Sequence, residues 1–427
     1  MSSTSTQSPG PVGYGALIRG NANFRNLWIG QIISLLGDWF NLIASAALIA
    51  ELSQSGFAVG GLFVVRMLAP FVVSPIAGVV ADRYNRKRIL ILTDIIRAII
   101  VLGFFLVTEP QHIWLLYTLT AIQLALSGFF FPTRGAILPE LVSPGELGSA
   151  NALSATTWSV MLALGAALGG IVSGTWGIYP AFAIDALTFI LSAFFIIQIG
   201  YDPPGPPDAS ERTISSALRQ YLDGLRYLGQ HLDILVISLQ KALAALFFTS
   251  GLQVIQVAIA KSIFSIGEAG GISLGLMFAI AGVGTGIGPI VARRFTGDRS
   301  RPLRVAILLG YLLSTLGMVI TAPLFNFETV LLGTLLRGIG GGILWVFSTQ
   351  LLLQLVPNHF RGRVFSTEFA FFTLMSAAGA SLAGGGLDSS LGIAGTLWWM
   401  TGLTLIPCAL WALWFVARAR TMHRFSP

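Results

Sequence analysis

The chain has 427 residues, of which 54% are hydrophobic and only 10% are charged. Soluble domains carry about 25% charged residues, so this composition excludes a soluble enzyme of the same size. The net charge of +7 does not by itself indicate nucleic-acid binding, because the position of the basic residues matters more than their number. Residues 1–21 are rich in Ser, Thr, Gly and Pro, and we interpret them as a flexible cytoplasmic tail.

Twelve segments are apolar over the roughly 20 residues that an α-helix needs to cross a bilayer core of about 30 Å. Their apolar runs are continuous rather than alternating, which disfavours a β-barrel. The predicted helices are 27–51, 57–80, 88–107, 112–131, 150–173, 177–200, 233–260, 271–292, 303–323, 328–353, 364–387 and 391–416.

The basic residues support this count. Twenty of the 25 Lys and Arg residues fall in the two tails or in the loops after every second helix, whereas the loops on the other side carry only Lys261. This asymmetry is the positive-inside rule with both termini in the cytoplasm. We therefore expect a multi-pass protein of the plasma (inner) membrane, embedded in lipid as a monomer.

A polar stretch, 201–232, separates an N-terminal half at 22–200 from a C-terminal half at 233–417, and residues 418–427 form a second cytoplasmic tail. The stretch opens with a stiff proline-rich run at 202–207. Two interpretations of the rest of the stretch stay open: an amphipathic helix on the cytoplasmic membrane face, or a solvated linker helix. The apolar residues at helical spacing are Ile214, Leu218, Tyr221, Leu222, Leu225 and Leu228.

The two halves resemble each other. The run Gly78-Val-Val-Ala-Asp82-Arg83 returns 210 residues later as Gly288-Pro-Ile-Val-Ala292-Arg293, and Leu141-Val142 returns as Leu355-Val356. We interpret this as a parallel repeat of six plus six helices. In such repeats the substrate site lies near the membrane midplane, between the halves.

Gly78 to Arg88 resembles the signature that the major facilitator superfamily carries between its second and third helices. Asn85 stands where glycine is usual, and asparagine tolerates the left-handed conformation that such a turn requires. The resemblance implies an all-α membrane fold of two six-helix bundles.

A narrower resemblance, to the drug:proton antiporter-3 branch, covers nearly the whole chain. That branch includes macrolide efflux proteins and exporters of the enterobactin-exporter type. The resemblance implies secondary active, proton-coupled efflux of a small amphipathic drug or siderophore by alternating access. The motifs that carry it are Gly37-Asp38-Trp39, Phe131 to Val142, Ser149 to Leu153, Ile184 to Phe189 and Gln354 to Arg363.

The same resemblance implies a cytoplasmic gate, in which Asp82 latches onto the cytoplasmic end of helix 11. We expect Glu368, in the first turn of helix 11, to meet Arg134, Arg83 or Arg86. The alternative is that the basic residues of this loop only set the topology. The predicted gate residues are Gly78, Asp82, Arg83, Arg86, Arg134 and Glu368.

Charges inside a bilayer are costly unless they are paired or hydrated. At 1.5 Å per residue, Asp38 lies roughly 18 Å and Arg66 roughly 14 Å from the ends of their helices, so both fall near the middle. We predict that they face each other as an ion pair. The pair either fixes the N-terminal half permanently, or opens when Asp38 takes a proton or Arg66 meets substrate.

Four more charged residues lie within predicted helices. Asp94 and Arg97, one turn apart, form either a local pair or an extension of the Asp38 network. Lys241 and Arg337 have no carboxylate at a matching depth in their own half, and an anionic substrate or an Asp across the interface is expected to satisfy Arg337. Lys241 alternatively extends toward the membrane surface. A fifth, Asp185, is assigned to helix packing.

Further polar side chains predict the lining of a central cavity. Thr249, Gln253 and Gln256 share one helix face, and the full set is Gln31, Asn41, Gln123, Lys241, Thr249, Gln253, Gln256 and Arg337. Most aromatic residues of the lining helices are expected to pack in the core, while a subset would suit a lipophilic or aromatic substrate. These aromatics are Trp39, Phe63, Phe129, Trp158, Phe248, Trp345 and Phe372.

The sequence contains no G-x-x-x-x-G-K-[ST] loop, so ATP-driven pumping is not expected. No metal cluster or nucleophile–base arrangement is visible in the sequence. We therefore expect no cofactor, no metal, no catalytic residue and no nucleic-acid partner. The expected partners are a small-molecule substrate and protons. Two alternatives stay open: a lysophospholipid flippase or uncoupled facilitator, and a transporter-like receptor or scaffold that transports nothing.

Overall fold

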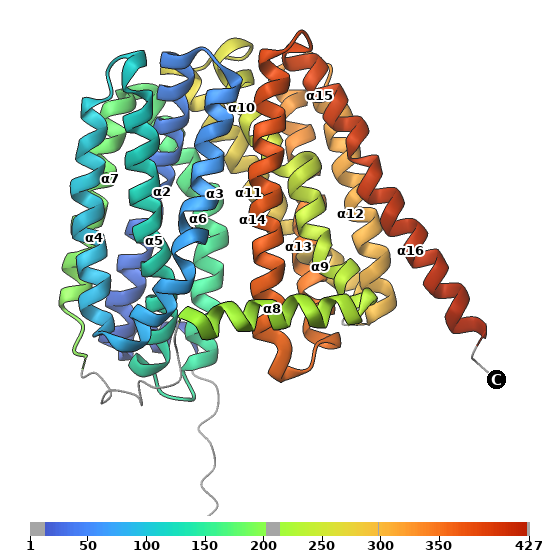
Figure 1. The fold of residues 1–427 in the computed structure, drawn as a ribbon. Helices are drawn as coiled ribbons and strands as arrows, with labels where there is room; N and C mark the ends of the chain where they lie inside the picture. Colours follow the sequence, from blue (N-terminus) through green and yellow to red (C-terminus); the bar gives the residue numbers. More distant parts are fainter. Residues whose placement is uncertain (1–12, 202–213, 298, 425–427) are drawn as a thin grey trace, which may run out of the picture.

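The computed structural model describes residues 13–201, 214–297 and 299–424 and is almost entirely helical (Figure 1). Among the described residues, twelve helical segments are long and apolar enough to cross a membrane. They succeed one another in the predicted order, so the predicted all-α fold with twelve spans is confirmed.

The spans form two six-helix bundles. The N-terminal bundle consists of α2 (Ala22–Ser53), α3 (Gly56–Arg83), α4 (Arg86–Leu102), α5 (Ile113–Leu141), α6 (Leu147–Trp176) and α7 (Ile178–Ile197). The C-terminal bundle consists of α9 (Leu232–Ala244) continuing into α10 (Ser250–Ser262), α11 (Gly271–Thr296), α12 (Ser300–Thr321), α13 (Phe327–Leu355), α14 (Asn358–Asp388), and α15 (Gly392–Leu403) continuing into α16 (Leu405–Arg424).

Two spans are interrupted within their apolar runs. The seventh span contains a π-helical segment, Ala245–Thr249, between α9 and α10. The twelfth span breaks at Thr404, between α15 and α16 and three residues before Pro407. Proline has no backbone N–H for the carbonyl four residues earlier, here that of Leu403. At the break the Thr404 hydroxyl donates to the carbonyl of Thr401 at 2.7 Å.

Several boundaries differ from the prediction. The fourth span ends at Leu141, ten residues beyond the predicted position 131. Its apolar run stops at Pro132, but the continuation is held by buried Ile137 and Leu138 at the base of the N-terminal bundle. Apolar windows find where a helix enters lipid, whereas tertiary packing decides where it ends.

The predicted N-terminal tail is partly wrong. Tyr14–Gly20 forms a short helix, α1, and Leu17 on it is fully buried among residues of the N-terminal bundle. Asn21 then caps α2 through a hydrogen bond from the backbone N–H of Phe24. Residues 1–12 of the predicted tail lie outside the described residues. At the other end of the chain, α16 continues to Arg424, so most of the predicted second tail is helical.

The linker carries α8 (Ile214–Gln230), which lies across one end of the molecule (Figure 1). It packs against α14 of the C-terminal bundle and also contacts α3 of the N-terminal bundle. Leu228 is 1% exposed, and the ring of Tyr227 stacks on Phe360 with centroids 4.4 Å apart. Part of the apolar face is therefore covered by protein, whereas Leu222 on the same face is 47% exposed. Neither interpretation of the linker included this packing against the bundles.

We call the end of the molecule that carries α8 the linker end, and the opposite end the closed end. Near the closed end the two bundles touch through glycines. A Cβ added at Gly170 of α6 would lie 2.5 Å from Cα of Gly275 on α11. One added at Gly60 of α3 would lie 2.7 Å from the carbonyl oxygen of Ala380 on α14. The absence of side chains here allows backbone contact between the bundles.

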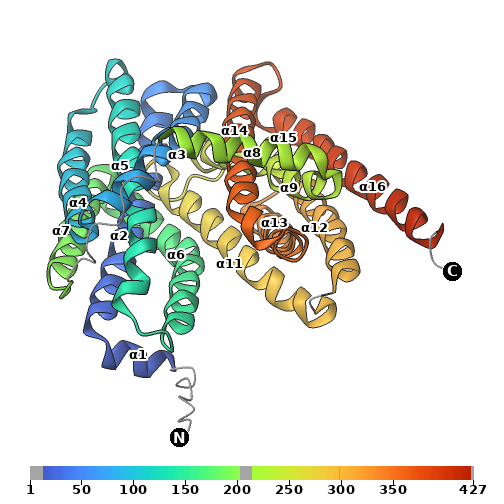
Figure 2. The same ribbon diagram turned by 60° about the horizontal axis from the view of Figure 1, so that its bottom comes forward.

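Toward the linker end the bundles separate. Gly78 lies on the same face of α3 as Gly60, eighteen residues or five turns further along, yet a Cβ added there would meet nothing within 4 Å. The same is true of Gly362, five turns from Ala380 on α14. The faces of α3 and α14 that join the bundles at the closed end are therefore open at the linker end. Figure 2 shows the two bundles from the linker end.

Candidate functional site

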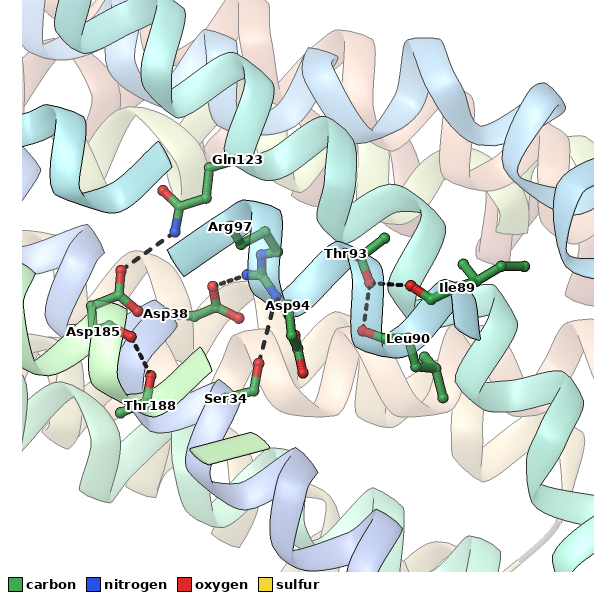
Figure 3. Close-up of polar contacts among 10 residues, drawn as sticks. All are labelled: Ser34, Asp38, Ile89, Leu90, Thr93, Asp94, Arg97, Gln123, Asp185 and Thr188. Atoms are coloured by element: carbon green, nitrogen blue, oxygen red, sulfur yellow. Dashed lines mark hydrogen bonds and ion pairs between the residues drawn. The ribbon is translucent and has the colours of Figure 1, made fainter. Parts of the chain in front are cut away.

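Five charged residues gather inside the N-terminal bundle, and we call them the charge cluster: Asp38 on α2, Arg66 on α3, Asp94 and Arg97 on α4, and Asp185 on α7. Figure 3 draws all of them except Arg66. At its centre the Arg97 guanidinium donates to the Asp38 carboxylate, and the two form an ion pair. The Arg97 side chain is fully buried, whereas that of Asp38 retains 17% of its exposure. Asp38 is therefore the member of this pair that can be reached from outside the bundle.

Arg97 is held on several sides. Its Nη1 lies 3.9 Å from Asp94 Oδ1 and 3.5 Å from the Ser34 hydroxyl, to which it donates. The guanidinium also stacks over the Phe189 ring, 3.9 Å from the centroid. Asp94 is fully buried. The structure thus shows the second of the two interpretations of Asp94 and Arg97, in which they extend the Asp38 network.

Asp185 belongs to the same network, so its assignment to packing alone is too narrow. It is fully buried and accepts a hydrogen bond from Gln123 on α5 at 3.4 Å. It comes close to Asp38 because Gly37 presents no side chain to α7. A Cβ at Gly37 would overlap the hydroxyl of Thr188 and lie 2.5 Å from Asp185 Oδ1.

The predicted Asp38–Arg66 ion pair is wrong in its partner, because Asp38 pairs with Arg97. Arg66 is half-buried and lies close enough to Asp38 and Asp185 for Coulombic interaction. In the part of the chain that the structure describes, it makes no ion pair or side-chain hydrogen bond. Depth along the helices placed Asp38 and Arg66 correctly at one level, but rotation about the helix axes directs Arg97 to Asp38.

In the C-terminal bundle the structure corrects the prediction that Lys241 has no carboxylate partner. Lys241 Nζ lies 3.0 Å from Glu368 Oε1 and donates to the Thr349 hydroxyl at 2.7 Å. The ammonium also sits 4.5 Å from the centre of the Trp345 ring. Glu368 is thus paired inside its own bundle rather than with Arg134, Arg83 or Arg86 of the predicted gate.

The polar residues predicted to line a cavity divide into two groups. Thr249 and Gln253 are half-buried and remain candidates for a lining. The other six, at most 8% exposed, are buried inside the bundles: Gln31, Asn41, Gln123, Lys241, Gln256 and Arg337. Spacing on a helix showed that these residues share faces, but not whether a face meets a cavity or a neighbouring helix.

Arg337 of α13 is held between helices rather than by a charge. Its backbone lies against α12, where a Cβ at Gly317 would approach its nitrogen at 2.6 Å. Within the described ranges its guanidinium forms no ion pair, and its Nε is buried without a hydrogen-bond partner. The predicted partner, an Asp across the interface, is not found among the described residues.

At the linker end of the N-terminal bundle, Arg86 forms ion pairs with Glu140 and, at 3.8 Å, with Asp82. Tyr201 donates to Glu140 at 2.7 Å, and burial raises the pKa of Tyr201 to about 12. Arg134 donates to the Ser154 hydroxyl at 2.8 Å. These contacts connect loops and helices of one bundle.

Two features of this end differ from the motif-based expectation. Asn85 adopts φ −59° rather than a left-handed conformation, and it caps α4 by accepting from the backbone N–H of Arg88. In the loop before α6, Glu146 accepts from the backbone N–H of Ser143 at 2.9 Å and also from Asn21. These hydrogen bonds, that from the Ser143 backbone foremost, lower the pKa of Glu146.

The contact between Lys241 and Glu368 had a signal in the internal repeat. The shift of 214 residues that takes Leu141 to Leu355 also takes Ser154 to Glu368. Ser154 of α6 binds the cation Arg134 of α5. Glu368 binds the cation Lys241 at the corresponding place on α14.

Comparison with known proteins gives consistent results. The family model described as Major Facilitator Superfamily matches residues 27–377. The putative bacilysin exporter BacE of Bacillus subtilis is 26% identical over 84% of this chain and 87% of its own. The enterobactin exporter EntS of Escherichia coli is 25% identical over 87% of this chain and 86% of its own.

Solved structures share the fold. A bacterial homologue of the human lysosomal transporter Spinster, described as inward-facing and unoccupied, superposes with a TM-score of 0.72 at 18% identity over 95% of this chain and 99% of its own. A bacterial homologue of the iron transporter ferroportin, described as inward-facing, gives a TM-score of 0.66 at 16% identity over 92% and 98%.

Proposed function

Because this chain belongs to the Major Facilitator Superfamily of membrane transporters, we propose that it is a proton-coupled exporter of small amphipathic compounds, working by alternating access. The single observation that carries the proposal is the composition of the charge cluster. Three carboxyl groups, Asp38, Asp94 and Asp185, meet two guanidinium groups, Arg66 and Arg97.

An unbalanced charge inside a low-dielectric bundle is costly. Three ionised carboxylates against two guanidinium ions leave one negative charge, which a single bound proton neutralises. Burial supports this count. Asp94 and Asp185 are fully buried, and the contact of Asp94 with Arg97 is long at 3.9 Å, so a neutral acid is the less costly state for one of the two.

Asp38 is the member suited to exchange that proton with solvent. It alone of the three carboxyl groups keeps partial exposure, and it shares Arg97 with Asp94. A proton on Asp38 weakens its ion pair and leaves Arg97 to Asp94. Loss of the proton restores the pair with Asp38. The helices that carry these residues, α2 and α4, are thereby held in one of two arrangements.

The contacts between the bundles supply the second requirement, which is a pair of alternating openings. The bundles touch by glycine contacts at the closed end and separate at the linker end. Rocking about the middle of α3, α6, α11 and α14 would close Gly78 and Gly362 and open Gly60 and Gly170. This motion fits the parallel repeat of the two halves.

The linker end is the cytoplasmic side in this proposal, because the tails and the basic loops lie there. The outward direction and the small-molecule cargo rest on relatives whose names identify them as exporters, of bacilysin and of enterobactin. One chain contains both bundles, so the proposed working unit is a monomer in a bacterial inner membrane.

Proton movement in liposomes tests the proposal. The protein is reconstituted with a pH-sensitive dye inside, a pH gradient is imposed, and lipophilic cations, macrolides and siderophores are added in turn. We expect at least one compound to collapse the gradient, and Asp38→Asn to abolish the collapse. Glu328→Gln, which removes an exposed carboxylate at the start of α13, is the matched control and should behave like the unmodified protein.

Two results would contradict the proposal. Substrate flux without proton movement would make the protein an uncoupled facilitator. Proton movement that persists in Asp38→Asn would place coupling outside the charge cluster. Correct insertion is checked in every variant by protease accessibility of the tails.

A further inference from the structure

Two edge-to-face aromatic pairs occupy corresponding places in the two bundles. In the N-terminal bundle, Phe131 of α5 meets Trp158 of α6 with ring centroids 6.1 Å apart and planes at 78°. In the C-terminal bundle, Trp345 of α13 meets Phe372 of α14 at 5.1 Å and 83°. We call these four residues the aromatic quartet.

The internal repeat relates the two pairs. A shift of 214 residues takes Phe131 to Trp345 and Trp158 to Phe372, and it is the shift that takes Leu141 to Leu355. The chain has therefore kept an aromatic pair at the same place in both halves, although the residue types are exchanged. Helix packing alone does not explain this, because three of the four side chains are partly exposed.

The exposed fractions are 37% for Phe131, 54% for Trp158 and 43% for Trp345. Trp158 does not point away from its bundle. Trp158 lies seven residues, or about two turns, before Gly165, whose face of α6 packs against Trp39 of α2. Phe372 likewise lies seven residues before Gly379, whose face of α14 packs against the π-helical segment Ala245–Thr249.

The quartet lies within the part of the molecule where the bundles diverge. Phe131 and Trp345 are each ten residues before the ends of α5 and α13 at the linker end, or roughly 15 Å along the helix. Nearer the closed end, the same helices α6 and α14 are joined to the opposite bundle by glycines. The two aromatic pairs thus lie at matching levels in the two bundles, about halfway into the protein.

The charges beside the two pairs are not balanced. Arg134, one turn after Phe131, donates to Ser154, one turn before Trp158. In the described part of the chain Arg134 has no carboxylate partner, and its Nε is buried without a hydrogen bond. On the other side, Lys241 beside Trp345 is neutralised by Glu368. The positive charge of Arg134 is therefore left without a carboxylate next to the aromatic quartet.

We propose that the aromatic quartet binds a planar aromatic ring that carries an anionic group, with the ring against Trp158 and Trp345 and the anion at Arg134. This inference rests on the proposed function in that such an aromatic acid is the exported compound. Aromatic rings suit each other edge-to-face or offset, and a guanidinium binds a carboxylate through paired N–H donors.

Calorimetric titration of the purified protein in detergent, without a pH gradient, tests this site. The probes are 2-naphthoate, its saturated analogue decahydro-2-naphthoate, and 2-naphthylmethylamine. We expect 2-naphthoate to bind about tenfold more tightly than the saturated acid, the size of one aromatic contact of about 1.5 kcal/mol. The amine, which carries the opposite charge, should bind least.

Variants assign the binding to the quartet. Trp158→Leu and Trp345→Leu should each weaken 2-naphthoate binding about tenfold, and Trp158→Phe should restore most of it. Trp176→Leu is the matched control, because Trp176 is also exposed on α6 but lies at the closed end. Arg134→Gln should remove the preference for the acid over the amine. Monodisperse elution confirms that each variant is folded.

Equal affinity for the saturated acid, unchanged affinity in both Leu variants, or no binding of 2-naphthoate would overturn the proposal. Failure of the proposed proton coupling is distinguishable from these results. The titration does not depend on proton movement, so binding of 2-naphthoate by a protein that moves no protons in the liposome assay would refute the coupling and leave the aromatic site standing.

Discussion

The contact between Asp388 and the start of α3 offers a sharp test of how the closed end is held. Asp388 ends α14, and its carboxylate accepts from the backbone N–H groups of Gly56 at 2.6 Å and Phe57 at 3.0 Å and from the Ser55 hydroxyl at 2.6 Å. A carboxylate is also favoured at a helix N-terminus. This cap on α3 comes from the other bundle, so it stabilises the closed end only while the bundles touch.

The size of the effect can be worked out from the geometry. Hydrogen bonds to charged groups contribute about 1.5–3 kcal/mol each when buried, but Asp388 is exposed, and solvent reduces such interactions to about 0.5 kcal/mol each. Three bonds then stabilise the closed end by about 1.5 kcal/mol. Asp388→Ala should therefore shift the ratio of closed to separated bundles at this end about tenfold.

Spin-label distances measure this ratio. Labels at Gln111→Cys and Phe325→Cys, in a Cys408→Ser background, report the separation of the bundles at the closed end, because both positions are exposed in loops there. Asp388→Ala should increase the long-distance population, whereas Glu328→Gln, which removes an exposed charge at the same end, should not. An unchanged distribution in Asp388→Ala, or an equal change in the control, would refute the reasoning.

Other contacts give three further predictions. Gly275→Ala places a Cβ 2.5 Å from the facing glycine of α6 and should open the closed end in the same spin-label assay, whereas Gly286→Ala on the same helix has open space and should not. Lys241→Met leaves Glu368 buried and unpaired and should destabilise the protein by about 3–5 kcal/mol, and adding Glu368→Gln should recover most of the lost thermal stability. Hydrogen bonds lower the pKa of Glu146 in the folded state, so its stabilising contribution is present above its ordinary value of about 4.3 and is lost as the pH falls. The difference in thermal midpoint between the unmodified protein and Glu146→Gln should accordingly shrink below about pH 4; a difference that is constant with pH would contradict this.

The number and order of the spans could be predicted from the sequence because each span carries its own signal. A run of about 20 apolar residues is independent of what the helix packs against, and each of the twelve predicted runs overlaps one membrane-length helical segment among the described residues. The repeat of the two halves was visible for a similar reason, since Leu141 and Leu355 keep their spacing from the residues around them.

The predicted boundaries are wrong where a helix extends beyond its apolar run. α5 extends past Pro132 because Ile137 and Leu138 find a core at the linker end. α1 forms in a stretch whose composition is typical of a flexible tail because Leu17 finds the same core. Neither stretch is apolar enough for its composition alone to predict that it packs against the core.

Residue order alone indicated that Asp38 and Arg66 lie at similar depths, because helix rise per residue is constant. It did not establish which charged residues touch, because contact depends on the rotation of each helix about its own axis. That rotation is set by close approaches such as Gly37 against Thr188, which brings Asp38 and Asp185 together. Tertiary structure therefore decided that Arg97, and not Arg66, is the partner of Asp38.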